Sequence, residues 1–183
     1  MVTFSWLHDP LIHLFSALGL ALLLGLGGLG KLRDRQGFAL VLEGYGQAWG
    51  QWLPAVLRGV LLLLLPALEL LAAVGLLCSP WLGWSAIPAA LLLGGYALVL
   101  AASLGRVEDC GCHLGARRQP PAAALVWRNL LLVLMAFNLL LPMTDRPLQG
   151  FDALTLGLAL MAGVAIYQLA HVLISNHALL KEL

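Results

Sequence analysis

The chain has 183 residues, of which 61% are hydrophobic and 10% are charged, and its mean hydropathy is +0.93. These values lie far outside the range of soluble globular domains and predict an integral membrane protein surrounded by the lipid bilayer. The formal net charge of +1 offers no basic surface for nucleic acid, and the sequence contains no phosphate-binding loop, zinc-protease helix or nucleophile elbow. We therefore expect no nucleic-acid partner.

The first predicted membrane span covers residues 11–30, a run of apolar residues broken by His13 and Ser16. No Lys or Arg precedes this run and no small-residue cleavage site follows it, so a retained helix is predicted rather than a signal peptide. His13 is interpreted as a helix-end or interface residue. We expect the glycines of this span to let a neighbouring helix approach closely. They are Gly19, Gly25, Gly27, Gly28 and Gly30.

An amphipathic helix is predicted for residues 37–52, because apolar and aromatic residues recur there at spacings of three or four. These residues are Phe38, Val41, Leu42, Tyr45, Trp49 and Trp52. Aromatic residues are common at membrane interfaces, so anchoring in the headgroup region is favoured over a role as a substrate groove. Glu43 and Gln47 are expected to face water.

The second predicted span, residues 54–78, contains Arg58, Pro66 and Glu69. Arg58 lies near the start and is expected to extend to the interface, and Pro66 is expected to bend the helix. Glu69 lies roughly 22 Å along the helix from Pro54, which predicts a carboxyl group inside the membrane. Two interpretations stay open: a Glu that is neutral or hydrogen-bonded for packing, and a proton carrier or a group that binds a polar ligand head.

The third predicted span, residues 84–105, runs antiparallel to the second, with Trp81 and Trp84 at the interface. Cys78 lies at the short connection and is expected to be a small buried apolar residue. The next two cysteines should lie at the opposite membrane face, about 30 Å away. No disulfide to Cys78 is therefore expected.

The following loop contains Cys110-Gly111-Cys112, preceded by two acidic residues and followed by His113. Residues two apart in a bent backbone can form a strained disulfide, and Gly111 permits the bend. Strained, exposed disulfides tend to be labile or catalytic, so thiol–disulfide exchange is the first hypothesis. Two alternatives remain: soft-metal binding by Cys110, Cys112 and His113, as copper(I) or as zinc with a fourth ligand, and a non-enzymatic membrane scaffold.

Two further spans are predicted, over residues 122–141 and 151–174. Arg128 lies in the first turns of the earlier span, where its guanidinium could stabilise a thiolate of the loop, pair with Glu69 or bind headgroups. Electrons exchanged at the cysteines would need a carrier, and a membrane quinone near Glu69 and Arg128 is one conjecture. Gln168 and His171 are interpreted as interfacial.

The basic residues predict the orientation, because nearly all fall on one side of this five-span arrangement. They are Lys31, Arg33, Arg35, Arg58, Arg106, Arg117, Arg118, Arg128 and Lys181, against Arg146 alone on the other side. The positive-inside rule then places the N-terminus outside and the Cys-Gly-Cys loop at the cytoplasmic end, where thiols are kept reduced. Either the pair is a reducing-side relay, or the loop folds into the bundle, or one span is miscounted.

Several residues together resemble the MauE family of methylamine utilisation proteins over nearly the whole chain. They are Gly30-Lys31, Tyr45, Pro66-x-x-Glu69 with Gly75, Asp109-Cys110-Gly111-Cys112 with Gly115, and Arg128-Asn129-Leu130. Where the family pattern has a phenylalanine after the second cysteine, this chain has His113, which adds a candidate ligand or proton acceptor beside a thiol.

The resemblance implies a bacterial inner-membrane protein, a single domain over residues 1–183 with a DoxX-like four-helix core. It implies a role in maturation of the disulfide-rich β subunit of methylamine dehydrogenase, together with a thioredoxin-like partner, MauD. Cys110 and Cys112 would then be the redox pair. The resemblance identifies the client less securely than the chemistry, because the family also has members outside methylamine operons.

Overall fold

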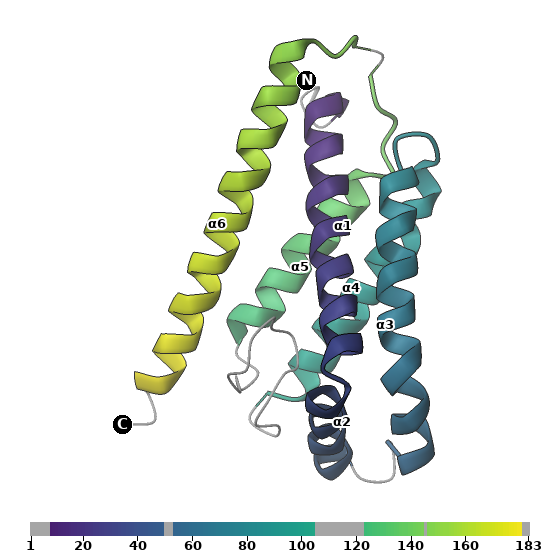
Figure 1. Ribbon diagram of the computed structural model, residues 1–183, viewed down its shortest axis with the longest axis vertical. Coiled ribbons are helices and arrows are strands. Elements are labelled where there is room, and N and C mark those ends of the chain that lie inside the picture. The colour runs from purple at the N-terminus through teal and green to yellow at the C-terminus, as the bar shows by residue number, and fades with distance from the viewer. Residues whose placement is uncertain (1–7, 50–52, 105–122, 145, 181–183) are drawn as a thin grey trace.

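The computed structural model describes residues 8–49, 53–104, 123–144 and 146–180, without the side chains of residues 171 and 174–180. The described residues form helices joined by short connections, with no strand among them (Figure 1). In chain order these are α1 (Pro10–Arg33), α2 (Arg35–Trp49), α3 (Ala55–Cys78), the 3₁₀ helix η3 (Gly83–Ala86), α4 (Ile87–Ala102), α5 (Ala123–Asn138) and α6 (Gly150–Leu180).

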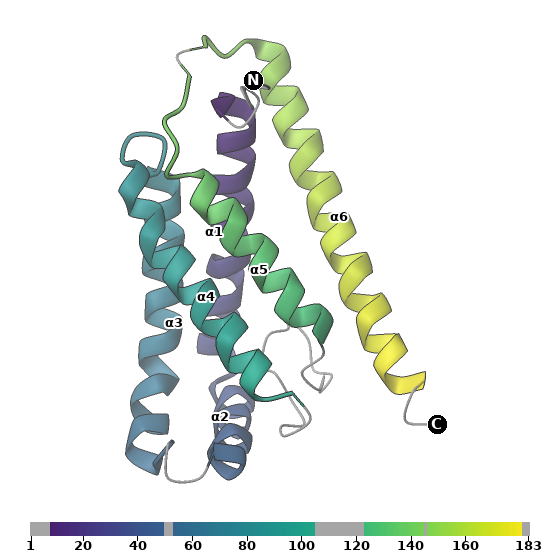
Figure 2. The same cartoon turned by 180° about the vertical axis from the view of Figure 1, so that it is seen from behind.

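Helices α1, α3, α4, α5 and α6 run up and down alternately, and α2 lies at one end of the bundle (Figures 1 and 2). By length and composition, four of the described helical segments can cross a membrane: α1, α3, η3 with α4, and the first 21 residues of α6. Helix α5 is apolar but has 16 residues. The predicted class, an all-α multi-pass membrane protein, is confirmed.

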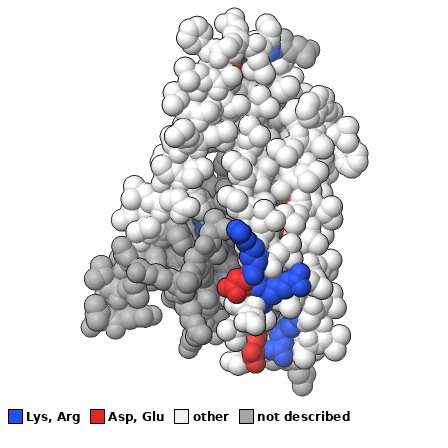
Figure 3. All heavy atoms as spheres, in the orientation of Figure 1, with Lys and Arg blue, Asp and Glu red and all other residues white. Residues whose placement is uncertain are grey.

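The two ends of the bundle differ in charge. The end that carries α2, here the α2 end, holds Lys31, Arg33, Arg35 and Arg58, and Figure 3 shows charged side chains gathered there. The opposite end, here the η3 end, carries Arg146, whose guanidinium lies 3.3 Å from Asp152 and 3.5 Å from Asp9. On the face shown in Figure 3, the described surface between the two ends is almost uncharged, as expected for a bilayer-facing band.

Helices α1 and α3 pack closely because small residues lie at their contact. A Cβ added to Gly28 would lie 3.1 Å from the Pro66 carbonyl oxygen, and one added to Gly25 would lie 3.8 Å from Ala73. In lipid, where no hydrophobic force drives helices together, such close approach supplies the packing energy. The expectation was wrong for Gly19, since an added Cβ there has no neighbour within 4 Å. Gly27 and Gly30 line a cavity.

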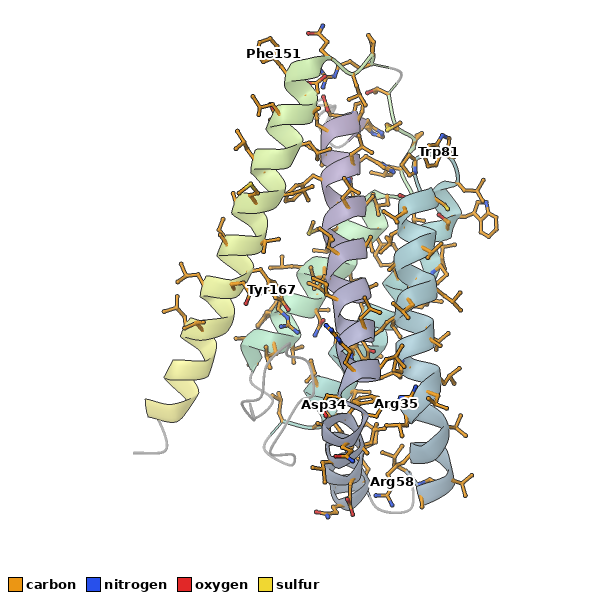
Figure 4. The ribbon with its side chains drawn as sticks, in the orientation of Figure 1. Asp34, Arg35, Arg58, Trp81, Phe151 and Tyr167 are labelled. Carbon is orange, nitrogen blue, oxygen red and sulfur yellow. The ribbon has the colours of Figure 1, made fainter. Side chains whose placement is uncertain are left out.

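The turn between α3 and η3 is held by one side chain. The Ser85 hydroxyl donates a 2.6 Å hydrogen bond to the Gly75 carbonyl oxygen. A Cβ added to Gly75 would lie only 2.7 Å from the Ser85 carbonyl oxygen, so the absence of a side chain at Gly75 permits this contact. At the same turn Trp81 is 82% exposed and points outward (Figure 4), as an interfacial tryptophan should.

Cys78 is exposed and its thiol is free, so the expectation of a buried residue was wrong. The cause is its position on α3. Cys78 shares an outward-facing stripe with Leu71 and Val74, which are 68% and 60% exposed, whereas Leu76 and Ser79 face the core. Spacings of three and four residues place all three exposed residues on one helix face.

Helix α6 stands apart from the other helices (Figures 1 and 2). None of its residues from Gly150 to Ala170 is buried, and its main packing partner is α1, where Phe15 lies against Gly163. At the η3 end the connection before α6 is tied to the start of α1. There the Thr144 amide and hydroxyl both donate to the His8 carbonyl oxygen, at 2.9 Å each.

Candidate functional site

The site begins with the break between α1 and α2 at Asp34 (Figure 4). The Asp34 amide donates to the Gly30 carbonyl oxygen at 2.9 Å and closes α1, and its carboxylate accepts the Gly37 amide at 2.9 Å and caps α2. The apolar face of α2 then turns toward the bundle, and Phe38, Leu42 and Tyr45 are all buried.

A cavity of about 610 Å³ lies inside the bundle and is lined by residues from α1 to α6. This volume is typical of small-molecule sites. The lining is mainly apolar, with aromatic side chains on several walls: Phe15, Phe38, Tyr45, Trp49, Tyr96 and Tyr167.

The apolar face of α2 therefore contributes to the cavity, as in the groove interpretation that was ranked below headgroup anchoring. Phe38, Val41, Leu42, Tyr45 and Trp49 all line the cavity. Glu43 and Gln47 on the other face are exposed, as expected. Trp52 lies outside the described residues.

Glu69 lies at the wall of the cavity and is 2% exposed. Its Oε1 atom accepts two hydrogen bonds of 2.6 Å, one from Lys31 Nζ and one from the Tyr96 hydroxyl. The Lys31 ammonium also lies 5.7 Å from the ring centroid of Phe38 and 5.6 Å from that of Tyr96. An ion pair between α1 and α3, supported by a hydroxyl from α4 and two aromatic faces, thus lies inside the bundle.

Gly27 leaves this ion pair open to the cavity. A Cβ at Gly27 would lie 3.9 Å from Lys31 Nζ and from both carboxylate oxygens of Glu69. No side chain of α1 therefore separates the pair from the cavity at this position. The Glu69 Oε2 atom is buried and has no hydrogen-bond partner among the described residues.

Arg128 lines the same cavity from α5. Its Nη1 donates to the Tyr167 hydroxyl at 3.1 Å, and its Cζ lies 5.6 Å from the centroid of that ring. Figure 4 shows Tyr167 on the side of α6 that faces the bundle. The suggested pairing of Arg128 with Glu69 is not found, and the carboxylate pairs with Lys31 instead. The Arg128 Nε atom is buried without a partner among the described residues.

The cavity thus brings together Glu69 and Arg128, which the sequence analysis predicts as site residues, with Tyr96, which it does not mention. It also adds Lys31, which appears there only as a basic residue and in the family resemblance. Lys31 was interpreted as a charge that orients the chain. Its place next to a predicted helix end and four residues after Gly27 was the available signal. Gln168, expected at the interface, also lines the cavity.

The remaining predicted site residues lie elsewhere. Cys110, Cys112 and His113 fall outside the described residues, as does Arg106, so the structure does not test the redox pair or the metal alternative. The described residues contain no group of three or more His, Cys, Asp or Glu side chains that could hold a metal. His13 is buried in the first turn of α1, at a helix end as expected, and is not part of the cavity lining.

These features define a class: a multi-pass helical membrane protein with an ion pair at the wall of an internal, mostly apolar cavity. A family model described as methylamine utilisation protein MauE matches residues 9–142. The chain belongs to this family. The matched range contains Lys31, Glu69, Tyr96 and Arg128 but not α6.

Related proteins also identify the MauE family. The methylamine utilization protein MauE of Paracoccus denitrificans is 35% identical over 135 residues, which are 72% of this chain and 70% of that protein. The protein of the same name from Methylophilus methylotrophus is 33% identical over 111 residues, which are 59% of this chain and 56% of that protein. No solved structure matches the chain.

Proposed function

We propose that this protein is a membrane-embedded thiol–disulfide redox component of methylamine utilisation, with Cys110 and Cys112 as its redox pair. Membership of the MauE family supports the physiological system, and the Cys-Gly-Cys sequence supports the chemistry. One structural observation carries the proposal. Helix α4 ends and α5 begins toward the α2 end (Figure 2), and both cysteines, which lie outside the described residues, belong to the chain between these two helices. Lys31, near the end of α1, and Arg128, near the start of α5, line the cavity.

The proposed reaction is a balanced exchange. A dithiol of a thioredoxin-like partner, of the MauD type, attacks the Cys110–Cys112 disulfide as a thiolate and forms a mixed disulfide. The partner's second thiol then resolves it, so the partner becomes a disulfide and the cysteine pair becomes a dithiol. The oxidised partner in turn oxidises thiols of a periplasmic client such as the β subunit of methylamine dehydrogenase.

The experiment is a set of serine substitutions tested in a methylamine-utilising host that lacks its own copy of the gene. Cys110→Ser and Cys112→Ser should each abolish disulfide formation in the β subunit, measured by alkylation and mass spectrometry, and growth on methylamine. Cys78→Ser is the matched control and should behave as the unsubstituted protein, because Cys78 lies on the outer face of α3.

A mixed disulfide gives a second readout. A chain with only one cysteine of the pair should trap the partner as a covalent complex that disappears on reduction. Activity that survives both loop substitutions would rule out the redox pair and leave the scaffold interpretation. Activity lost only when bound copper is lost would support the metal alternative instead.

We also propose that the protein lies in the bacterial inner membrane with its N-terminus in the periplasm. The basic residues at the α2 end support this orientation through the positive-inside rule. The same orientation places the Cys-Gly-Cys loop at the cytoplasmic end of the bundle. Exchange with a periplasmic partner therefore requires that the loop fold into the bundle, one of the alternatives that the sequence leaves open.

A further inference from the structure

The internal cavity contains unmatched polar atoms of two opposite kinds. Glu69 Oε2 is an acceptor and Arg128 Nε is a donor, and neither has a partner among the described residues. Leaving a buried polar atom unpaired is unfavourable, and more so for a charged group. Both residues line one cavity, so a single ligand that both donates and accepts hydrogen bonds would pair with both atoms once the two side chains turn toward it.

The walls of the cavity indicate the shape of that ligand. Apart from its charged residues the lining is dominated by leucines and aromatic rings, and several positions are glycines with no side chain to fill the space. Added Cβ atoms at Gly19 and Gly95 would meet nothing within 4 Å. Flat surfaces of this kind suit a planar ring, and the leucines suit an apolar chain.

Helix α6 determines how such a ligand enters. It forms one wall of the cavity through Gly163, Val164 and Tyr167, yet its membrane-spanning part has no buried residue. Helix α1, the main partner of α6, packs far less extensively against α6 than against α3. The cavity is therefore bounded on this side by a loosely packed helix, and a lipid-soluble molecule can reach it from the bilayer.

We propose that this cavity binds a membrane quinone and its hydroquinone. The ring carbonyls accept hydrogen bonds from Lys31 and Arg128, and a hydroxyl of the reduced form donates to Glu69 Oε2. The isoprenoid chain lies along the apolar walls and leaves past α6. A single-chain carboxylate would pair with Arg128 but would leave Glu69 Oε2 unsatisfied in every state, whereas the hydroquinone form pairs with both residues.

The proposal rests on the proposed function in one respect, the source of electrons. When two thiols close to a disulfide they release two electrons and two protons, which is what a quinone takes up to become a hydroquinone. Binding itself does not depend on the cysteines, so it can be tested without them.

The test is photolabelling of the purified full chain in detergent with an azido-quinone that carries a short alkyl chain. We expect saturable labelling of peptides from α1, α4, α5 or α6, displaced by decylubiquinone. Gly27→Leu places a side chain beside Glu69 and Lys31 and should weaken labelling at least tenfold. The matched control is Gly94→Leu, since Gly94 also has open space but does not line the cavity; it should label normally.

Further variants distinguish loss of quinone binding from loss of thiol exchange and from misfolding. The double variant Cys110→Ser/Cys112→Ser should bind the quinone normally even though thiol exchange is lost, so loss of function and loss of binding are read independently. If Gly27→Leu does not fold, Gly95→Leu fills the cavity from α4 and should show the same loss. Labelling unaffected by both substitutions, or displacement by palmitate as effective as by decylubiquinone, would overturn the proposal.

Discussion

Lys31 and Glu69 form a buried ion pair in which neither partner can be replaced alone without cost. Its Glu69 side chain is 3% exposed and its Lys31 side chain is 14% exposed, so loss of either partner leaves a charge that water hardly reaches. Breaking a buried pair in this way costs about 3–5 kcal/mol in soluble proteins. Replacing both partners by apolar residues is often nearly neutral, because no lone charge remains.

A double-substitution series tests this contact. Lys31→Met and Glu69→Met alone should each lower the thermal unfolding temperature of the detergent-solubilised protein by several degrees, whereas the combined variant should recover most of that loss. Tyr96→Phe, which removes one hydrogen bond and keeps the ring, should have a smaller effect. Strictly additive losses in the double variant would show that the two charges do not stabilise each other.

The sequence predicts the position of Glu69 along its helix but not its partner. Distance along the helix was enough to place Glu69 inside the membrane. It could not identify Lys31 as the partner, because that requires the α1–α3 register, which depends on the contact of Gly28 with Pro66. The exposure of Cys78 was missed for a similar reason, since hydropathy alone does not tell which face of an all-apolar helix points to lipid.

At the scale of elements, the η3 end of the bundle depends on the close approach of α3 and η3. A side chain at Gly75 would collide with the Ser85 backbone, and backbone atoms cannot move aside as a flexible side chain can. Overpacking of this kind typically costs about 1–3 kcal/mol.

Gly75→Ala should therefore lower the thermal unfolding temperature, and Gly59→Ala is its control within the same helix. An added Cβ at Gly59 meets nothing within 4 Å, so alanine there should be neutral or slightly stabilising through its higher helix propensity. Equal changes in the unfolding temperature for the two substitutions would mean that helix propensity, and not the contact with Ser85, determines stability at Gly75.

Hydropathy was enough to predict the membrane-spanning helices, and the all-α class was predicted correctly. The role of α2 was not, because an amphipathic helix at the headgroup level and one that closes a cavity have the same periodicity. The difference lies in Asp34, whose cap sets the angle between α1 and α2 and turns the apolar face inward. A capping residue is visible in sequence, but the direction of the chain after it is not.

For the whole molecule, the orientation in the membrane is the property with the widest consequences. In a cysteine-free chain, a cysteine placed by Trp81→Cys reports on the η3 end and one placed by Glu43→Cys reports on the α2 end, since both positions are exposed. With a membrane-impermeant maleimide on intact cells, we expect labelling at position 81 and protection at position 43 until lysis.

The same reagent then locates the redox pair, in a chain with Cys78→Ser. Protection of Cys110 and Cys112 from outside, with labelling after lysis, is the result expected from the charge distribution. Labelling from outside only after reduction would mean a periplasmic disulfide and would contradict the orientation inferred from the basic residues. The two reporter positions show whether the whole bundle or the loop alone is on the unexpected side.

The cavity is formed by residues inside and outside the range that the family model matches. Its charged residues come from the part of the chain that the family model matches, whereas the wall formed by α6, including Tyr167 beside Arg128, lies beyond residue 142. Two proteins with the same ion pair and the same guanidinium can therefore differ in the width of the pocket through their C-terminal helices alone. Changes in α6 can therefore alter which molecules enter the cavity and leave its charged residues unchanged.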